Sequence, residues 1–233
     1  MRDKGLMFDI NVSALQEFIT EPWKHGPHFK ALKYILSDSK VLDVGCSKGY
    51  IADLLKFKKC YVVGIEKDKP TSNIARKYCN EVITTDIENF AELPYPDGFF
   101  DFILCLDVLE HIARPDIILD KLRNYLSNNG SIIVSLPNIA RFENRLKLLF
   151  GKFDYNEKAS AFNKGHLRFF TLKTAKDLVQ SAGFRIIKIE YTGLCSIVKV
   201  FPALTAFQFL LVAKKNILFE CTKKDKKEIS WTR

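Results

Sequence analysis

The chain has 233 residues, 47% of them hydrophobic, which is enough for one large domain with a buried core. Its formal net charge is +9, from 36 lysines and arginines against 27 aspartates and glutamates, and such an excess can attract nucleic acid or a membrane surface. Residues 214–233 alone hold seven basic and three acidic side chains, so we predict a solvated basic tail there rather than a binding arm.

The cysteines and the apolar runs argue against three further classes of protein. The six cysteines form no C-x-x-C pair and several lie in apolar runs, which indicates buried thiols rather than a disulfide framework or a zinc site. No continuous apolar stretch follows the N-terminus, so no signal peptide is expected. The apolar run 194–213 is interrupted by Lys199, Pro202 and Gln208 and is expected to hold parts of two strands, not a membrane span. We therefore expect a cytoplasmic protein, with buried thiols at Cys46, Cys60, Cys79, Cys105, Cys195 and Cys221.

The segment 1–40 is predicted to form an N-terminal helical cap before a main domain at 41–213. Residues 8–37 show two helical patterns, and Pro27 can open the second helix. The apolar stripe of that helix would consist of Phe29, Leu32, Ile35 and Leu36.

A strand, a tight turn and a helix are predicted in succession from Val41. A short apolar run ends at Gly45, and Gly49 directly precedes an apolar-periodic segment. The glycines permit close approach of a ligand to the backbone, and the N–H groups at the helix start favour a negative group or a series of acceptors. The turn is therefore a candidate ligand cradle.

Two familiar chemistries compete for this turn. A dinucleotide fingerprint would need a third glycine where Tyr50 stands, which weakens that interpretation. The turn also spells G-x-S-x-G, the nucleophile elbow of serine hydrolases, with Ser47 as nucleophile and His166 as a candidate partner. No HGGG-type oxyanion segment precedes it, so this second interpretation is also disfavoured.

From Val41 onward, strand and helix patterns alternate in short units, which predicts an α/β protein with a mostly parallel sheet and helices on both faces. Ligands of such sheets bind outside the carboxyl ends of the strands. The expected strands are 41–44, 61–65, 82–84, 100–106, 132–135, 184–191 and 207–213, the expected helices are 49–57, 71–78, 116–126 and 172–182, and 126–131 is expected to be a turn.

The segment Asp43-Val44-Gly45-Cys46-Ser47-Lys48-Gly49 resembles the first motif of the class I S-adenosylmethionine-dependent methyltransferases. The stretch from Phe100 to Ile112 is similar to the corresponding motif in the small-molecule branch of that family. The resemblance implies a Rossmann-like three-layer sandwich whose seven-stranded sheet is mostly parallel with an antiparallel last strand, and S-adenosylmethionine as cofactor. Ser47 stands where the family usually has glycine.

The resemblance also implies which residues bind the cofactor. Asp43 would help to hold its amino group, Glu66 would accept hydrogen bonds from the ribose hydroxyls, and Asp86 would accept from the adenine amino group. Each acid alone could be a solvated strand end or a turn residue, but their shared place at strand ends favours the cofactor. The expected set is Asp43, Gly45, Ser47, Gly49, Glu66, Asp86, Ile87, Leu106 and Asp107.

Residues 139–165 are predicted to be an insertion with an amphipathic helix. Phe142 and Leu149 fall on its apolar face, while Arg145 and Lys147 fall largely on the other face. Membrane attachment is one interpretation. The preferred interpretation is an apolar face packed on the body of the protein, with the insertion acting as a substrate lid.

The stretch from Leu149 through His166-Leu167-Arg168-Phe169-Phe170-Thr171 resembles a bacterial subgroup linked with polysaccharide or lipid biosynthesis. That subgroup commonly has an aspartate three residues before the histidine, but this chain has Asn163, which would not stabilise an imidazolium. His111 and His166 are the candidate general bases, although two alternatives stay open for His111, a helix cap or a bond to a backbone carbonyl, and one for His166, a lid-anchoring hydrogen bond. By analogy the acceptor is a hydroxyl on a small molecule, glycan or lipid, and no metal is expected.

Two rival functions stay open. A nucleic-acid or protein methyltransferase would explain the positive charge, but no N-P-P-Y-type segment follows the fourth strand, so nucleic acid is disfavoured as a partner. Peripheral membrane contact stays open. A non-catalytic protein that retains the fold is the second rival, and the intact Asp43, Glu66 and Asp86 argue against it.

Overall fold

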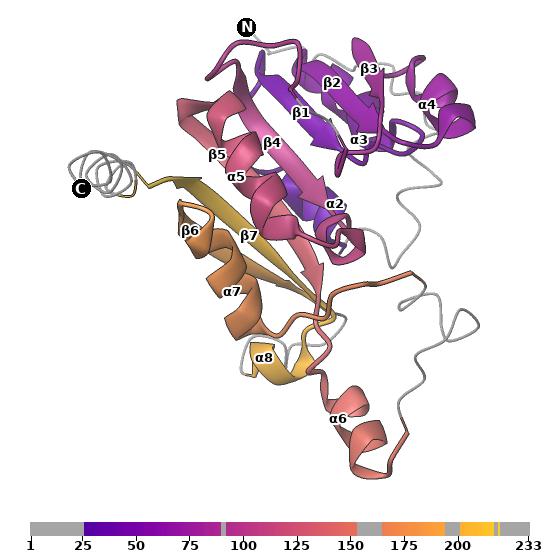
Figure 1. Ribbon diagram of the computed structural model, residues 1–233, viewed down its shortest axis with the longest axis vertical. Coiled ribbons are helices and arrows are strands. Elements are labelled where there is room, and N and C mark those ends of the chain that lie inside the picture. Colours follow the sequence, from indigo (N-terminus) through magenta and orange to yellow (C-terminus); the bar gives the residue numbers. More distant parts are fainter. Residues whose placement is uncertain (1–25, 90–91, 153–164, 194–200, 217–218, 220–233) are drawn as a thin grey trace, which may run out of the picture.

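The computed structural model describes residues 26–89, 92–152, 165–193, 201–216 and 219. Its centre is a seven-stranded sheet with the order β3-β2-β1-β4-β5-β7-β6 (Figure 1). The strands are β1 (Lys40–Val44), β2 (Tyr61–Glu66), β3 (Glu81–Thr84), β4 (Phe100–Leu106), β5 (Leu126–Pro137), β6 (Phe184–Thr192) and β7 (Gln208–Lys215).

Short helices follow most of the strands. α3 begins after Gly49, α4 is capped by the Asp68 carboxylate, which accepts from Thr71 N at 2.9 Å, and α7 begins with a reciprocal Thr171–Thr174 capping box. The helices are α2 (Pro27–Ala31), α3 (Tyr50–Leu55), α4 (Lys69–Ala75), α5 (Pro115–Tyr125), α6 (Phe142–Leu149), α7 (Leu172–Ser181) and α8 (Pro202–Thr205), with 3-10 turns η2 (Lys56–Lys58) and η3 (Leu109–His111).

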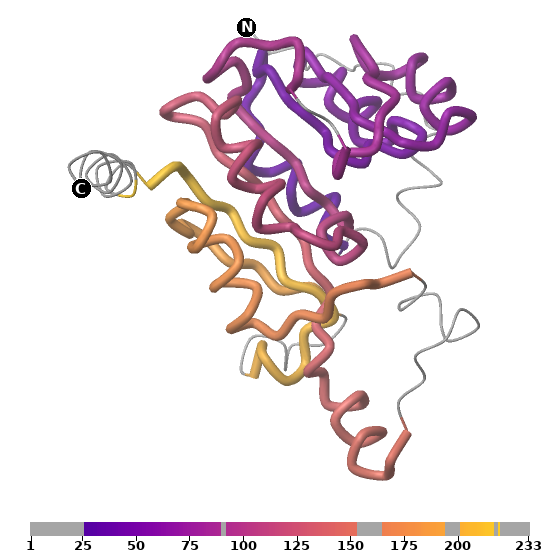
Figure 2. The backbone as a smooth tube through the Cα atoms, in the orientation of Figure 1, coloured from indigo at the N-terminus to yellow at the C-terminus, as the bar shows by residue number. Residues whose placement is uncertain are grey.

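The direction of the strands confirms the predicted fold class. Strands β1 to β5 pair in parallel, and β7 runs antiparallel to both of its neighbours, β5 and β6. The early part of the chain builds one half of the sheet and the late part builds the other half (Figure 2). Because the strand order reverses between β1 and β4, a crevice for a ligand is expected at the carboxyl ends of these two strands.

Helices cover both faces of the sheet, which gives three layers. On one face, buried residues of α2, α3 and α4 pack with Val41, Val62 and Leu104. On the other face, α5 and α7 pack with the strands through Leu119, Val179 and their neighbours. Strands buried on both faces explain the nearly continuous apolar runs of the sequence.

The predicted turn at 126–131 is wrong. β5 already begins at Leu126, which pairs with Phe100, and after an irregularity Ser131 pairs with Phe102. Gly130 suggested a turn, but a Cβ atom there would lie 2.8 Å from the Asp101 carbonyl oxygen. The glycine is thus required by close approach of β4 rather than by a change of direction.

Two helices differ from expectation in how they pack. α2 ends at Ala31, so the expected stripe is not formed: Ile35 is buried, whereas Phe29 and Leu36 are exposed. The predicted amphipathic helix of the insertion exists as α6, but none of its residues is buried, so the expectation that its apolar face packs on the body is wrong. The role of the insertion as a lid stays a prediction.

The four cysteines that fall among the described residues are free and buried, as predicted: Cys46, Cys60, Cys79 and Cys105. Cys195 and Cys221 lie outside the described residues, as do most of the predicted cap and the basic tail. No helix in the described part of the chain has the length and apolar character needed to cross a membrane.

Candidate functional site

The predicted cradle is a turn between β1 and α3 with three residues in the left-handed region. Gly45, Ser47 and Gly49 have φ values of 70°, 49° and 84°. A Cβ atom at Gly45 would lie 2.5 Å from Cγ2 of Val108, which follows β4. Gly45 therefore lets the first turn lie directly against the segment after β4, as a shared ligand crevice requires.

Ser47 adopts a conformation that is unfavourable for a residue with a side chain, at a cost of about 1 kcal/mol. Its backbone N–H donates to Glu66 Oε2 at 3.1 Å, which ties the turn to the end of β2. Among the described residues no histidine bonds to its hydroxyl, so the arrangement of a serine nucleophile with a base is not formed there.

Asp43 lies at the carboxyl end of β1 and is 3% exposed. Burial, and then the nearby Glu66 carboxylate, raise its pKa from 3.8 to about 7. Its Oδ2 atom is buried and has no hydrogen-bond partner in the described part of the chain. A buried carboxylate oxygen without a donor fits a ligand that carries a cation or N–H groups, such as the ammonium of the methionine part of S-adenosylmethionine.

Glu66 and Asp86 occupy the corresponding ends of β2 and β3. Glu66 is partly exposed, and its second oxygen, Oε1, accepts from Asp68 N at 2.8 Å. Asp86 is also partly exposed and accepts from Glu88 N at 3.0 Å, while Ile87 beside it is buried. The three predicted acids thus follow three adjacent strands on one edge of the sheet, as the sequence led us to expect.

Asp107 follows Leu106 at the end of β4 and also has a left-handed backbone, with φ of 57°. Its Oδ1 accepts from Ser135 Oγ at 2.5 Å and from Gln208 Nε2 at 2.9 Å. Its Oδ2 lies 4.0 Å from His28 Nδ1. Residues of β5 and β7 therefore hold this carboxylate by hydrogen bonds at the predicted crevice, and a residue of α2 lies near it.

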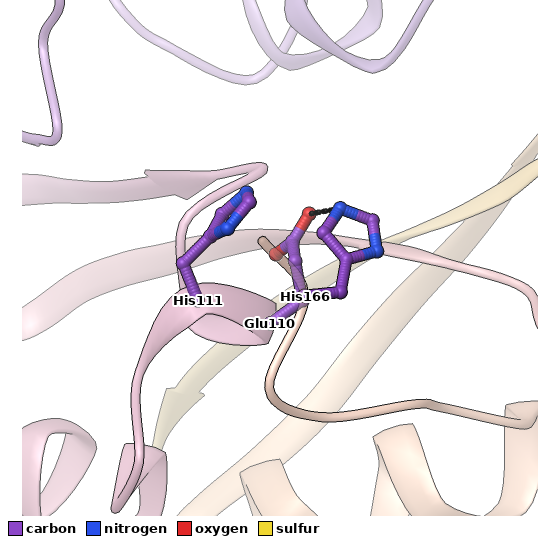
Figure 3. Close-up of side chains that lie close together, drawn as sticks. All are labelled: Glu110, His111 and His166. Carbon is purple, nitrogen blue, oxygen red and sulfur yellow. Dashed lines mark ion pairs between the residues drawn. The ribbon is translucent and has the colours of Figure 1, made fainter. Parts of the chain in front are cut away.

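His111 and His166, separated by more than fifty residues in the chain, lie side by side (Figure 3). Their ring centroids are 4.7 Å apart and the ring planes meet at 75°. His111 Nδ1 lies 3.0 Å from the Gly165 carbonyl oxygen. Because a carbonyl oxygen can only accept, a hydrogen bond here places a proton on Nδ1, and in the neutral form of the ring Nε2 then has a lone pair that can accept one.

Glu110, which lies in the η3 turn beside His111, completes this group and was not predicted from the sequence. It is 1% exposed, its Oε1 lies 3.9 Å from His166 Nε2, and its Oε2 has no hydrogen-bond partner among the described residues. Burial, and then Asp107, raise its pKa from 4.5 to about 8. Burial, and then His111, lower the pKa of His166. At neutral pH His166 is therefore mainly uncharged.

Backbone contacts explain why distant segments meet at this point. The Glu110 carbonyl accepts from Leu167 N at 2.8 Å and from Arg168 N at 3.0 Å. The Arg168 guanidinium also donates through Nε to the Ala113 carbonyl at 3.1 Å. These bonds hold the His166 segment against the η3 turn that carries His111. Asn163, the expected orienting residue, lies outside the described residues.

The same three side chains could also hold a divalent cation. Glu110, His111 and His166 each offer one ligand atom, and these atoms lie within 4.8 Å of one another. Two imidazoles and a carboxylate suit several transition metals. The expectation of a metal-free site therefore stays a prediction.

Comparison with known proteins identifies the family. A family model described as a methyltransferase domain matches residues 15–189. The chain belongs to this methyltransferase family. Family and fold together confirm the predicted class of enzyme and S-adenosylmethionine as its cofactor, whereas the predicted polysaccharide and lipid subgroup stays a prediction.

Individual relatives of this methyltransferase are distant. A Mycolicibacterium smegmatis protein named as an S-adenosylmethionine-dependent methyltransferase is 26% identical over 164 residues, which cover 70% of this chain and 58% of that protein. A ubiquinone biosynthesis O-methyltransferase of Acinetobacter baylyi is 27% identical over 109 residues, 44% of this chain and 45% of that protein. The chain thus spans about half the length of these relatives.

The solved structures support the fold alone. The crystal structure of a SAM-dependent methyltransferase from Archaeoglobus fulgidus matches with a TM-score of 0.62 at 18% identity. The matched region covers 80% of this chain and 90% of the Archaeoglobus chain. An identity this low shows that the architecture is shared and does not specify an acceptor.

Proposed function

We propose that this methyltransferase transfers a methyl group from S-adenosylmethionine to a hydroxyl oxygen of a small-molecule, glycan or lipid acceptor. The observation that carries the proposal is the His111 ring, whose Nδ1 is held by Gly165 and whose Nε2 is left to accept a proton. Relatives named as ubiquinone biosynthesis O-methyltransferases support an oxygen acceptor on a small molecule.

The residues that would hold the cofactor follow the strand order. Asp43 would bind the ammonium of the methionine part, Glu66 the ribose hydroxyls, and Asp86 the adenine amino group. The Gly45, Ser47 and Gly49 backbone, together with Leu106 and Asp107, would line the methionine end, and Ile87 would pack on the adenine. The unpartnered Asp43 Oδ2 supports this orientation.

Bound S-adenosylmethionine supplies an electrophilic methyl group on a sulfonium that is already a good leaving group, so the protein chiefly has to position the acceptor. A hydroxyl acceptor becomes a stronger nucleophile when its proton is accepted as the bond to carbon forms. His111 is an exposed residue, and in the proposed reaction its Nε2 accepts that proton. His166 and Glu110 lie behind it as positioning residues, because both are buried.

Calorimetric titration with S-adenosylmethionine and S-adenosylhomocysteine tests the cofactor site. The wild type is expected to bind both, and Glu66→Ala to bind at least about tenfold more weakly, since each hydrogen bond to a charged group contributes about 1.5–3 kcal/mol. Asp97→Ala, a carboxylate outside the crevice, is the matched control. Absence of binding by the wild type would contradict the proposal.

The acceptor class is tested by methyl transfer from labelled cofactor to panels of catechols, hydroxylated lipids, glycans, RNA and protein. Labelled product in the hydroxyl-bearing small-molecule, glycan or lipid panels, lost in His111→Ala but with cofactor binding intact, is the expected result. Label that appears only in RNA or protein would instead favour the rival functions.

A further inference from the structure

The helix α6 and the residue after it present a cluster of exposed large apolar side chains. Four large apolar residues of this region are at least half exposed, Leu149 by 78%, Phe150 by 70%, Phe142 by 54% and Leu148 by 50%. No residue of α6 is buried, and the helix projects from the end of the molecule away from the sheet (Figure 1). So much exposed apolar surface on one short helix indicates a binding partner.

The charges around this surface favour an anionic partner. Residues 141–152 contain four basic side chains and one acidic side chain, Glu143, which is already paired with Arg141 at 2.7 Å. Lys147 and Lys152 are exposed and have no carboxylate partner in the described part of the chain. Basic side chains beside exposed phenylalanine and leucine are the pattern of helices that lie in the headgroup region of a lipid bilayer.

The base of the helix is fixed to the body. The Arg141 guanidinium lies 3.8 Å from the centre of the Phe207 ring, and Asn144 Nδ2 donates to the Ile139 carbonyl at 3.0 Å. α6 follows directly on β5, whose carboxyl end lies beside that of β4, where Asp107 and His111 stand. A surface bound by α6 would therefore be on the same side of the sheet as the candidate active site.

We propose that α6 docks the protein on an anionic lipid bilayer, with Phe142, Leu149 and Phe150 inserted among the headgroups and Arg145, Lys147 and Lys152 against the lipid phosphates. An apolar acceptor dissolved in that bilayer would then be presented on the side of the sheet that holds the histidines. The docking does not depend on methyl transfer, so it is measured without cofactor or acceptor.

Vesicle co-sedimentation tests the proposal on the full chain. The wild type is expected to sediment with vesicles of equal parts phosphatidylglycerol and phosphatidylcholine, much less with phosphatidylcholine alone, and less again at high salt. The double variant Leu149→Asp, Phe150→Asp should partition at least about tenfold more weakly. Leu36→Asp, which changes an apolar residue that is 67% exposed elsewhere on the surface, should bind as the wild type does.

Charge variants separate α6 from the other basic parts of the chain. Lys147→Glu with Lys152→Glu should weaken binding by about fivefold or more for each lysine replaced, because one basic residue near an anionic surface contributes about 1 kcal/mol. Lys188→Glu, an exposed lysine of β6, is the matched control. These variants leave the apolar residues in place, so their effect does not depend on the folding of the aspartate variant.

Three results would overturn the proposal. The first is a wild-type chain that stays in the supernatant with anionic vesicles. The second is an aspartate variant that sediments as well as the wild type, because binding would then come from another part of the chain. The third is a concentration-dependent dimer by analytical ultracentrifugation that the aspartate variant abolishes, since α6 would then bind a second copy of the protein.

Discussion

His111 and His166 lie with their ring centroids 4.7 Å apart, and the edge of one ring faces the plane of the other. His111 is exposed and its Nδ1 lies 3.0 Å from the Gly165 carbonyl oxygen, whereas His166 is buried. The two rings therefore have different parts to play, although the sequence presents them as equivalent candidates.

Replacement of each histidine should affect catalysis differently. His111→Ala should lower kcat by about 10²–10⁴-fold, because it removes the group that accepts the proton. His166→Phe should lower kcat less and should alter its pH dependence, since His166 acts by positioning His111. The pH profile of kcat with a hydroxyl acceptor is the measurement, and affinity for S-adenosylhomocysteine, which both variants should retain, is the control. Equal and complete loss in both would contradict this division.

Removal of metal ions should leave methyl transfer unchanged. The proposed transfer needs a proton acceptor and a positioned acceptor hydroxyl; the His111 side chain supplies the first, and the protein's contacts with the bound acceptor provide the second without a metal. Dialysis against a strong chelator, followed by assay with and without added Mg²⁺, Mn²⁺ or Zn²⁺, is the measurement. Loss of activity that one of these ions restores, and that Glu110→Gln abolishes, would show that Glu110, His111 and His166 hold a cation.

Cofactor binding should release protons near neutral pH. In the free chain Asp43 has a pKa of about 7, so about half of the molecules carry the proton at pH 7. A bound ammonium favours the ionised carboxylate and lowers this pKa, so binding releases about half a proton at pH 7 and less above pH 8. Affinity should correspondingly fall as the pH drops below about 7.

Calorimetry in buffers of different ionisation enthalpy measures this proton release. Asp43→Asn should bind more weakly and should lose the release that belongs to Asp43. If the wild type and the variant release the same number of protons, the ammonium does not meet Asp43.

Gly45→Ala should destabilise the fold because the added methyl group would overlap the Val108 side chain. The overlap can be removed separately by Val108→Ala. The new Cβ would lie 2.5 Å from Val108 Cγ2 in a backbone with φ of 70°. The overlap should cost about 1–3 kcal/mol and the left-handed backbone about 1 kcal/mol more. Thermal unfolding of Gly45→Ala, Val108→Ala and the double variant forms a double-mutant cycle, in which the double variant should recover the overlap cost but not the backbone cost. Strictly additive effects would contradict the contact.

The sequence predicts the parts of this molecule that depend on local pattern. Apolar runs bounded by glycines, all within about a dozen residues, are enough to predict the strands β1 and β4 and the turn after β1. The acids Asp43, Glu66 and Asp86 were found because each stands at the end of such a strand. The short α2 could not be foreseen in the same way, since its end depends on packing rather than on its own periodicity.

Other residues of the site escaped prediction because only tertiary contacts bring them there. Glu110 is buried and its carbonyl is bonded by the segment that follows Gly165, and nothing in the 3-10 turn around it signals either contact. Gln208 reaches Asp107 across 101 residues because β7 inserts between β5 and β6, an order that the sequence pattern does not encode. The one signal in the sequence that Glu110 belongs to the site was its position directly before His111, in the segment after β4.

The convergence on Asp107 has a consequence for the order in which the site is assembled. Its carboxylate accepts hydrogen bonds from Ser135 and Gln208 and lies 4.0 Å from His28 Nδ1, and these residues come from the middle, the end and the beginning of the described chain. During synthesis on the ribosome, His28 and Ser135 are added to the chain well before Gln208. The surroundings of Asp107 are therefore completed only after β7 has been synthesised and has entered the sheet, and a chain truncated before β7 would lack them.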